Sequence, residues 1–333
     1  QRVAFAAASA SGAPIVIADE PTKGLDAARR DAVVALLART PEAGGALLTI
    51  THDIEVARRL GGEVILLRRG EVVERGPAAQ LLAAPQSDYG RRLLAAEPTR
   101  WPAPPPLTAA RTAPVITARG LAKARGGRQL FAGLDISVQP GEIVGVVGPS
   151  GCGKSTLGDL LLGLGAADAG EIRREVDSPL ACQKLYQDPP AAFSPHWRLA
   201  RLLDDLVCRH RLDRTAIAPL MARLGLDEAL LGRRPGEISG GELQRFAILR
   251  VLLLAPRFLF ADEPTSRLDP ITQRETLTLL VALARERRCG VMLVSHDPAL
   301  VERICDRRLS LEPETPEPGA ASADRARVVE ETV

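Results

Sequence analysis

The stretch that most constrains this chain is Glu142–Thr156, which reads EIVGVVGPSGCGKST. Its apolar run Ile143–Val147 is short and rich in valine, as expected for a buried strand of a parallel sheet. The run leads into GPSGCGKS, which fits the pattern G-x-x-x-x-G-K-[ST] at every fixed position, and then into Thr156–Leu162, a predicted helix. A strand, a glycine loop and a helix in this order indicate a phosphate-binding loop.

Each residue type in this loop has a physical reason for being there. Glycines let backbone N–H groups turn inward onto phosphate oxygens, and the N-terminus of the following helix adds a positive dipole. Lys154 is predicted to reach the β- and γ-phosphates of a nucleotide, and the Ser155 hydroxyl to ligate Mg²⁺. A glycine-rich turn that matches by chance is the alternative, and the flanking strand and helix argue against it. The predicted cofactor-binding residues of the loop are Gly148, Pro149, Ser150, Gly151, Cys152, Gly153, Lys154, Ser155 and Thr156.

Length and composition are those of an ordinary globular protein. A chain of 333 residues with 46% hydrophobic and 25% charged residues predicts about two domains. The net charge of +2 gives no sign of a nucleic-acid partner, and no stretch approaches the ~18 uncharged apolar residues of a membrane span. The cysteines lack C-x-x-C spacing, which predicts reduced thiols in a cytosolic protein and no metal site. They are Cys152, Cys182, Cys208, Cys289 and Cys305.

An internal repeat organises the rest of the chain. The segment IVIADEPTKGLD aligns with FLFADEPTSRLD, which places Asp19-Glu20 on Asp262-Glu263. With one inserted residue, the alignment extends forward and places His52 on His296. It extends back to Gln1 without a gap, and the first residues read as the middle of a helix rather than a signal peptide. We therefore expect the sequence to begin inside a domain.

The repeat and the distribution of proline predict four parts. Residues 1–98 are the C-terminal part of a first module, and residues 115–312 are a complete second copy. Residues 99–114 are rich in proline, which predicts a semi-rigid extended linker. Residues 313–333 are polar and contain Pro and Gly, so we expect a disordered tail.

Apolar runs alternate with helical patterns in both copies, which predicts an α/β core with a mainly parallel sheet. The predicted strands are Ile15–Ala18, Leu47–Thr51 and Val64–Leu67 in the first copy, and Ile143–Val147, Phe258–Ala261 and Val291–Ser295 in the second. Helices are also predicted over Arg245–Leu254 and Gln273–Arg287.

Two carboxylates end one of these strands. Asp262 and Glu263 follow the apolar run Phe258–Ala261, and ligands bind at the C-terminal ends of strands in open α/β sheets. Asp262 is predicted to hold Mg²⁺, directly or through water, and Glu263 to polarise the attacking water as a general base. A solvated acidic turn is the alternative, and the phosphate loop upstream argues against it.

In their order along the chain, these motifs resemble those of the ATP-binding subunits of ABC transporters. The segment ISGGELQR at Ile238–Arg245 is similar to the family's LSGGQ signature, with Ile for Leu and Glu for Gln. In the family this signature reaches across a dimer and caps the ATP bound by the opposite module, which implies that role for Ser239, Gly240 and Gly241. Two glycines and a serine at a helix N-terminus form an anion-binding end.

Three further residues match motifs of the family. Gln187 matches the Q-loop glutamine, which implies that it senses Mg²⁺ and the attacking water and that its loop couples to the membrane subunit. Asp269, at the end of SRLD, matches the D-loop and is assigned to the cofactor site. His296 matches the switch histidine, which contacts the γ-phosphate. The first copy carries the same assignments at Asp19, Glu20, Asp26 and His52.

The resemblance implies a P-loop NTPase fold of the ABC type, with a mainly parallel core sheet, an antiparallel β subdomain and a helical subdomain. It implies ATP and Mg²⁺ as cofactors. One departure concerns the base, because Arg125 stands where the family stacks adenine on an aromatic residue. Its guanidinium plane could stack on a base, or base recognition is weak here.

A second departure is that residues 1–98 contain no phosphate loop, Q-loop or signature. In the family, each ATP needs the phosphate loop of one module and the signature of the other. We therefore expect no productive closure between the two copies of one chain, whereas two chains could pair through their second copies.

Three segments resemble one branch of the family, the importers for oligopeptides, dipeptides and nickel. They are APQSDYGRRLLAAEP around Tyr89, YQDPPAAFSP around Gln187, and DPALVERICD at Asp297–Asp306, which is similar to the nickel-type members. A short amphipathic surface helix is the alternative for the first segment. The branch usually has two separate ATPase subunits, whereas here two domains would be fused, the first truncated at its N-terminus. Membership implies permease subunits and an extracytoplasmic solute-binding protein as partners, a second ABC domain in cis or in trans, no nucleic acid, and a peripheral place on the cytoplasmic face of the membrane.

Two other functions compete with this one. A soluble twin-module ABC protein that acts on ribosomes or DNA would be expected to carry a long charged linker or zinc-binding cysteines, and the sequence has neither. A non-catalytic remnant of a broken gene is the other, and it fails if an upstream reading frame supplies the missing motifs. We therefore expect an ATP-binding and ATP-hydrolysing subunit that energises an importer for peptides, nickel or a related small solute.

Overall fold

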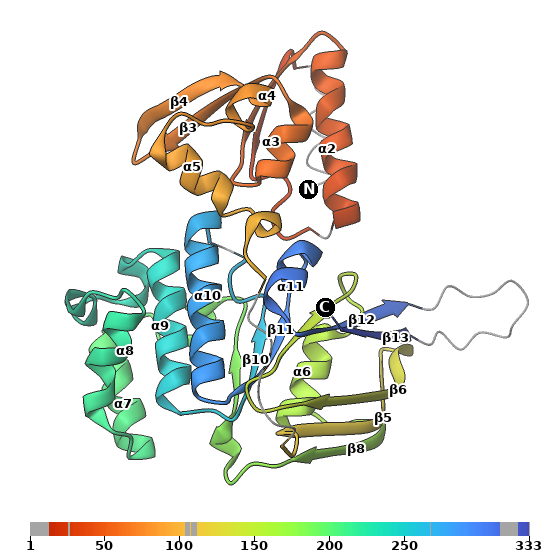
Figure 1. Ribbon diagram of the computed structural model, residues 1–333, viewed down its shortest axis with the longest axis vertical. Coiled ribbons are helices and arrows are strands. Elements are labelled where there is room, and N and C mark those ends of the chain that lie inside the picture. Colours follow the sequence, from red (N-terminus) through yellow and green to blue (C-terminus); the bar gives the residue numbers. More distant parts are fainter. Residues whose placement is uncertain are drawn as a thin grey trace, which may run out of the picture. The chain divides into compact units, whose positions relative to one another are not determined.

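The computed structural model describes residues 13–25, 27–103, 107, 112–266, 268–313 and 326–332 (Figure 1). The chain divides into two compact units. Unit 1 comprises Gln1–Trp101 with Asp269–Arg274, and unit 2 comprises Pro102–Leu268 with Glu275–Val333. Asp26, one of the predicted site residues of the first copy, lies outside the described residues.

Unit 1 contains two small sheets and a set of helices. Strands β1 (Ile15–Asp19) and β2 (Ala46–Ile50) pair in parallel, and β3 (Glu63–Arg68) and β4 (Glu71–Pro77) pair as an antiparallel hairpin. The helices are α2 (Ala27–Glu42), α3 (Ile54–Leu60), α4 (Ala78–Leu81), α5 (Asp88–Ala95) and the 3₁₀ turn η1 (Pro98–Arg100).

Local capping explains where the helices of unit 1 begin. The Asp53 side chain accepts hydrogen bonds from the backbone N–H groups of Glu55 and Val56 at 3.0 and 3.2 Å, which starts α3. Ser87 accepts in the same way from Gly90 and starts α5, the segment around Tyr89. The apolar sides of α3, α4 and α5 pack with β3 in one cluster. Its buried members are Ile54, Leu66, Ala78, Leu81, Leu82 and Leu94.

The predicted linker begins later than residue 99. Trp101 is buried, and its indole N–H donates to the carbonyl oxygen of Ala96 at 2.9 Å, which holds this residue against the end of α5. Residues 104–106 and 108–111 of the predicted linker lie outside the described residues.

Unit 2 is built on a six-stranded sheet with the order β13-β12-β7-β11-β10-β9. All neighbouring pairs are parallel except the pair at one edge, β12 with β13, which confirms the predicted mainly parallel core. The strands are β7 (Ile143–Val147), β9 (Cys182–Leu185), β10 (Phe258–Asp262), β11 (Gly290–Val294), β12 (Arg307–Pro313) and β13 (Ala326–Thr332).

The expectation of a disordered tail is wrong for residues 326–332, because they form β13. Without β13, strand β12 would expose a row of unpaired backbone N–H and C=O groups at the sheet edge. The tail segment ARVVEET supplies two valines and a threonine, residue types that favour strands, and pairs antiparallel with β12.

A second, antiparallel sheet and a helical region complete unit 2. The antiparallel sheet has the order β6-β5-β8, from β5 (Ile116–Arg125), β6 (Arg128–Val138) and β8 (Ala169–Arg174). The helices are α6 (Lys154–Leu162), α7 (Leu199–His210), α8 (Ile217–Arg223), α9 (Gly240–Leu253), α10 (Pro270–Glu286) and α11 (Pro298–Ile304). Short 3₁₀ turns lie at η2 (Pro179–Ala181), η3 (Pro189–Ala192), η4 (Arg214–Ala216), η5 (Glu228–Gly232) and η6 (Pro235–Glu237).

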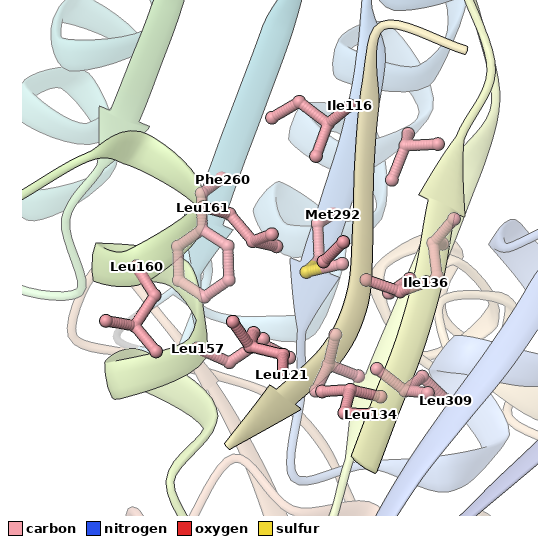
Figure 2. Close-up of a cluster of buried hydrophobic side chains, with 14 of the residues drawn as sticks. Ile116, Leu121, Leu134, Ile136, Leu157, Leu160, Leu161, Phe260, Met292 and Leu309 are labelled. Atoms are coloured by element: carbon pink, nitrogen blue, oxygen red, sulfur yellow. The ribbon is translucent and has the colours of Figure 1, made fainter. Parts of the chain in front are cut away.

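The core of unit 2 fixes helix α6, and with it the phosphate loop. Figure 2 shows leucines of α6 packed between side chains of the parallel sheet and side chains of the β5–β6 hairpin. The fit is close at Gly158, where a Cβ atom would lie 2.3 Å from the ring of Phe260. At the other end of α6, the guanidinium of Arg174 donates to the carbonyl oxygens of Leu160 and Leu161, both at 2.7 Å, and so places a cation at the helix C-terminus.

Candidate nucleotide site

The loop between β7 and α6 has a backbone that only glycine accommodates at two places. Gly148 has φ +148°, and a Cβ there would lie 2.4 Å from the carbonyl oxygen of Leu311. Gly153 has φ +107°, and a Cβ there would lie 3.1 Å from Cβ of Leu130. Side chains at either position would clash or strain the turn. The loop therefore has the shape that lets its N–H groups face a phosphate at the start of α6.

Lys154 is the first residue of α6, and its side chain is buried. Its ammonium group donates to the carbonyl oxygens of Gly148 and Pro149 at 2.7 and 3.0 Å, so it lies across the mouth of the loop. Both of these partners are neutral. A phosphate group in the loop would therefore give this buried cation an anionic partner, which is a stronger hydrogen-bond acceptor.

The Ser155 hydroxyl and the Asp262 carboxylate, the two predicted Mg²⁺ ligands, lie within hydrogen-bond distance of each other at the C-terminal end of β10. Burial raises the pKa of the Asp262 carboxyl, and a hydrogen bond from the Ser155 hydroxyl and the charge of Lys184 oppose that shift. The described residues contain no cluster of three or more His, Cys, Asp or Glu side chains suited to a metal. A serine oxygen and one carboxylate do fit Mg²⁺, which is usually held by one or two protein ligands together with phosphates and water.

Gln187, Glu263 and His296 come together although they are far apart in the sequence. The carboxylate of Glu263 lies 2.6 Å from Nε2 of His296, and the amide of Gln187 donates to its other oxygen at 2.7 Å. The Glu263 side chain is only 10% exposed. Its backbone is left-handed, with φ 46°. The structure therefore gathers the predicted general base, the Q-loop glutamine and the switch histidine into one cluster.

The first copy repeats the glutamate–histidine contact of this cluster. In unit 1 the carboxylate of Glu20 lies 2.6 Å from Nδ1 of His52, and Asp19 ends β1 as Asp262 ends β10. Glu20 also has φ 46°.

The signature segment forms the start of α9. The Ser239 hydroxyl donates to the Glu242 carboxylate at 2.7 Å and accepts from the Glu242 backbone N–H at 3.2 Å. This pair is a capping box, and the serine hydrogen bond holds the pKa of Glu242 below its usual range. Gly240 and Gly241 open the helix. Among the described residues, the hydrogen bonds of the Ser239 hydroxyl are those with Glu242, within the start of α9 itself.

Two other predicted residues have local structural roles in this structure. The Asp269 carboxylate accepts from the backbone N–H groups of Ile271 and Thr272, both at 3.1 Å, and so caps α10. Arg125 is exposed and pairs with Arg128 across the turn that joins β5 to β6.

Lys184 is a residue that the sequence patterns missed. It lies on β9 beside Phe260 of β10, and its ammonium group lies 2.6 Å from the Asp159 carboxylate. Its positive charge lowers the pKa of Asp262 and so partly offsets the rise caused by burial. Lys184 therefore favours the charged form of the predicted Mg²⁺ ligand. The only signal in the sequence is a lysine within the short strand CQKL, which has no motif context.

Comparison with known proteins agrees with this geometry. A family model described as ABC transporter matches residues 131–266. The peptidoglycan transport ATP-binding protein YejF of Agrobacterium fabrum is 33% identical over 335 residues, covering 92% of this chain and 61% of that protein. The glutathione import ATP-binding protein GsiA of Pectobacterium atrosepticum is 33% identical over 365 residues, covering 92% of this chain and 58% of that protein. The chain thus spans about 60% of the length of these relatives.

Solved structures share the fold. Clostridium perfringens cbiO1, part of the ABC transporter complex cbiONQ, matches with TM-score 0.53 at 23% identity, over 60% of this chain and 85% of that chain. The ATP-binding cassette MJ0796 bound to ADP and Pi matches with TM-score 0.52 at 24% identity, over 61% of this chain and 97% of that chain. An archaeal ribosome recycling factor matches with TM-score 0.66 at 22% identity, over 94% of this chain and 59% of that chain. These likenesses confirm the predicted ABC-type ATPase fold.

The described helices include none that is long and apolar enough to cross a membrane. The region matched by the family model contains β7, the phosphate loop, Gln187 and the strand that ends in Asp262. The place within the oligopeptide and nickel branch and the fusion of two domains remain predictions. Residues 131–266 of this chain match the family model described as ABC transporter, and the fold is that of an ABC-type ATPase.

Proposed function

We propose that this chain binds and hydrolyses ATP as the energising subunit of an ABC importer. The observation that carries the proposal is the convergence of Gln187 and His296 on the two oxygens of Glu263. This cluster follows the strand that carries Asp262, whose carboxylate meets Ser155 of the phosphate loop. A phosphate group, a metal and a water-activating carboxylate would therefore lie side by side.

Each side chain has a role in this chemistry. Lys154 and the loop N–H groups hold the β- and γ-phosphates, and Ser155 and Asp262 hold Mg²⁺, which neutralises charge on the phosphates when bound. Glu263 accepts the proton of the attacking water, and Gln187 and His296 aim its carboxylate. His296 also contacts the γ-phosphate. The signature residues Ser239, Gly240 and Gly241, with Asp269, would complete the site from an opposing module.

The cargo proposed for the importer is a peptide or a peptide-like solute. Two relatives are named for peptidoglycan transport and glutathione import, and the segment around Tyr89 resembles importers of oligopeptides. Nickel, which the same branch also transports, is a weaker candidate because neither of these names includes it. Permease subunits, an extracytoplasmic solute-binding protein and a second ABC domain, in cis or in trans, are the proposed partners. The proposed location is peripheral, on the cytoplasmic face of the membrane.

The test measures the mass of the Glu263→Gln chain by size-exclusion chromatography with light scattering, with and without Mg-ATP. We expect ATP to bind and produce a dimer, because turnover that would reopen the closed state is blocked. Lys154→Ala in the same background is the control and should remain monomeric. Failure of the Glu263→Gln chain to bind ATP overturns the proposed function. A monomer that binds ATP overturns only the closure of two second copies on each other.

A further inference from the structure

Lys184 places a positive charge inside unit 2, on the side of the sheet that faces α6. Its side chain is only 11% exposed. The register of β9 and β10 sets it beside Phe260, and its ammonium group lies 5.8 Å from the centre of that ring and 5.3 Å from the centre of the Tyr186 ring. Lysine is almost never buried to this extent without an anionic partner. The charge therefore needs a carboxylate within reach.

The partner is Asp159 of α6, whose carboxylate lies 2.6 Å from the ammonium nitrogen. Asp159 follows Ser155 by four residues, so the two side chains lie on one face of the helix. The same face meets β10, because Gly158 packs against the ring of Phe260, which Figure 2 shows lying against α6. Asp262, two residues further along β10, points to the same side of the sheet. The ion pair and the two predicted Mg²⁺ ligands thus share one layer between α6 and the sheet.

Charges of both signs act on Asp262 in this layer. Burial raises its pKa most, the carboxylates of Glu263 and Asp159 add to the rise, and Lys184 lowers it. Lys184 therefore offsets part of the repulsion among three carboxylates while no metal is bound. A Mg²⁺ ion held by Ser155 and Asp262 would add two positive charges on the same side of the sheet as the ammonium group. The lysine thus favours the metal-free site and opposes the metal.

We propose that Lys184 sets how strongly nucleotide binding depends on Mg²⁺, acting through the charges of Asp159 and Asp262. Its ammonium group is the built-in counter-ion of the metal-free site. It sustains nucleotide binding without metal, because it keeps the negative charge near the phosphate loop low, and it reduces the gain in affinity that Mg²⁺ supplies. This role rests on the proposed function, because nucleotide and Mg²⁺ must bind at this site.

A buried ion pair that only stabilises the fold is the alternative. Removal of such a pair would change nucleotide affinity by the same factor with and without metal, because the metal has no part in its role. The quantity that separates the two roles is the metal gain, which we define as the dissociation constant in EDTA divided by the dissociation constant in Mg²⁺. This ratio measures the coupling between nucleotide and metal rather than overall stability.

The test is a titration of a fluorescent, non-hydrolysable ATP analogue at pH 8, with EDTA or with saturating Mg²⁺. This pH is far above the ordinary range of carboxyl pKa values, so that the variants differ in fixed charge. We expect the unsubstituted chain to bind in EDTA. Lys184→Met should raise the metal gain at least about fivefold, and Asp159→Asn should lower it by a similar factor. The double variant removes both charges and should lie within about twofold of the unsubstituted chain.

Two controls separate charge from packing. Lys184→Arg keeps the positive charge and should keep the metal gain within about twofold. Lys123→Met removes a lysine from another ion pair, with Asp168 at 2.7 Å beside the antiparallel sheet, and should leave the metal gain unchanged. Asp159→Asn replaces a 42% exposed carboxylate by an amide of the same shape, so it carries the test even where Lys184→Met does not fold.

Three outcomes overturn this role and leave the proposed function standing. Equal metal gain in all four chains makes the ion pair structural. A lower metal gain in Lys184→Met shows that the lysine helps the metal by supporting Asp262. Binding to the unsubstituted chain that is seen only with Mg²⁺ shows that Lys184 does not sustain metal-free binding. Absence of binding in both conditions overturns the proposed function, and this role with it.

Discussion

The carboxylate of Glu263 lies 2.6 Å from Nε2 of His296, and Glu20 lies 2.6 Å from Nδ1 of His52 in the other copy. Both glutamates adopt the same left-handed backbone, with φ 46°. A non-glycine residue in this conformation costs about 1 kcal/mol or more and persists where the surroundings impose it. Its recurrence in both copies indicates that this backbone turn is what aims each carboxylate at its histidine.

Glu263→Gln is expected to keep ATP binding and to lower the rate of hydrolysis at least about 100-fold, because an amide cannot take a proton from water. Steady-state phosphate release and equilibrium ATP binding measure the two effects separately. Glu302→Gln on α11 removes the same charge from an exposed side chain and should leave both unchanged. Hydrolysis that persists in Glu263→Gln would remove the general-base assignment.

Lys154→Ala is expected to abolish ATP binding, because the buried ammonium group is the cation at the mouth of the loop. Lys154→Met keeps the length of the side chain without the charge and should lose binding as well. Titration with a fluorescent ATP analogue measures both. Near-normal affinity in the methionine variant would show that Lys154 contributes packing rather than charge.

The strands were the most predictable part of this fold. All six predicted strands form, and each begins and ends within one residue of its predicted bounds. Short apolar runs between polar turns leave little freedom in where a strand begins and ends. Helix α9 begins five residues earlier than the predicted Arg245, at Gly240. The capping box between Ser239 and Glu242 outweighs the low helix propensity of the two glycines.

Some residues of the candidate site could be predicted from the sequence, and others could not. The position of Glu263 at a strand end, together with the resemblance of Gln187 and His296 to motifs of the ABC family, was enough to predict that these residues belong to one site, and the structure places them in contact. Their roles in hydrolysis remain predictions. The approach of Lys184 to Asp262 depends on which strands are neighbours in the sheet, and sequence pattern carries no information on that. The sequence also did not predict β13, because a polar segment forms a strand only when it can pair with the exposed edge of a sheet, here strand β12.

Gly158→Ala is expected to destabilise unit 2 by about 1–3 kcal/mol. In an open helix this change would stabilise by about 1 kcal/mol. Here the new methyl group would lie 2.3 Å from the Phe260 ring, so overpacking outweighs the gain in helix propensity. Urea unfolding measures the effect. Gly232→Ala, where a Cβ meets nothing within 4 Å, is the control, and Phe260→Leu in the Gly158→Ala background should restore part of the loss.

Arg125→Tyr is expected to tighten ATP binding several-fold. The Arg125–Arg128 pair flanks a two-glycine turn, and Leu130 further along β6 packs against Gly153 of the phosphate loop, so the start of β6 borders the site. An aromatic ring offers a base a larger stacking surface than a guanidinium group does. Arg119→Tyr on the same strand is the control. Equal ATP affinity in Arg125→Tyr and in the unsubstituted chain would show that the base does not contact this position.

Asp262→Asn is expected to stop hydrolysis and at the same time to raise the melting temperature by a few degrees at neutral pH. Burial raises the pKa of Asp262, so its charged form is penalised in the folded state, and asparagine keeps an oxygen acceptor for Ser155 without the charge. A substitution that removes such an unfavourable buried charge is expected to raise the free energy of unfolding by about 0.5–2 kcal/mol.

The pH dependence of this stabilisation has a definite sign. As pH rises from the ordinary Asp pKa of about 3.9 through the raised folded value, the unfolded chain releases its proton first, and the aspartate form loses stability. The advantage of asparagine should therefore be absent at low pH, where both side chains are neutral, and complete above the folded pKa. Melting curves of both forms across this range measure it. An advantage that is independent of pH would assign the effect to packing, and a lower melting temperature at neutral pH would show that the charged carboxylate is stabilised by its neighbours.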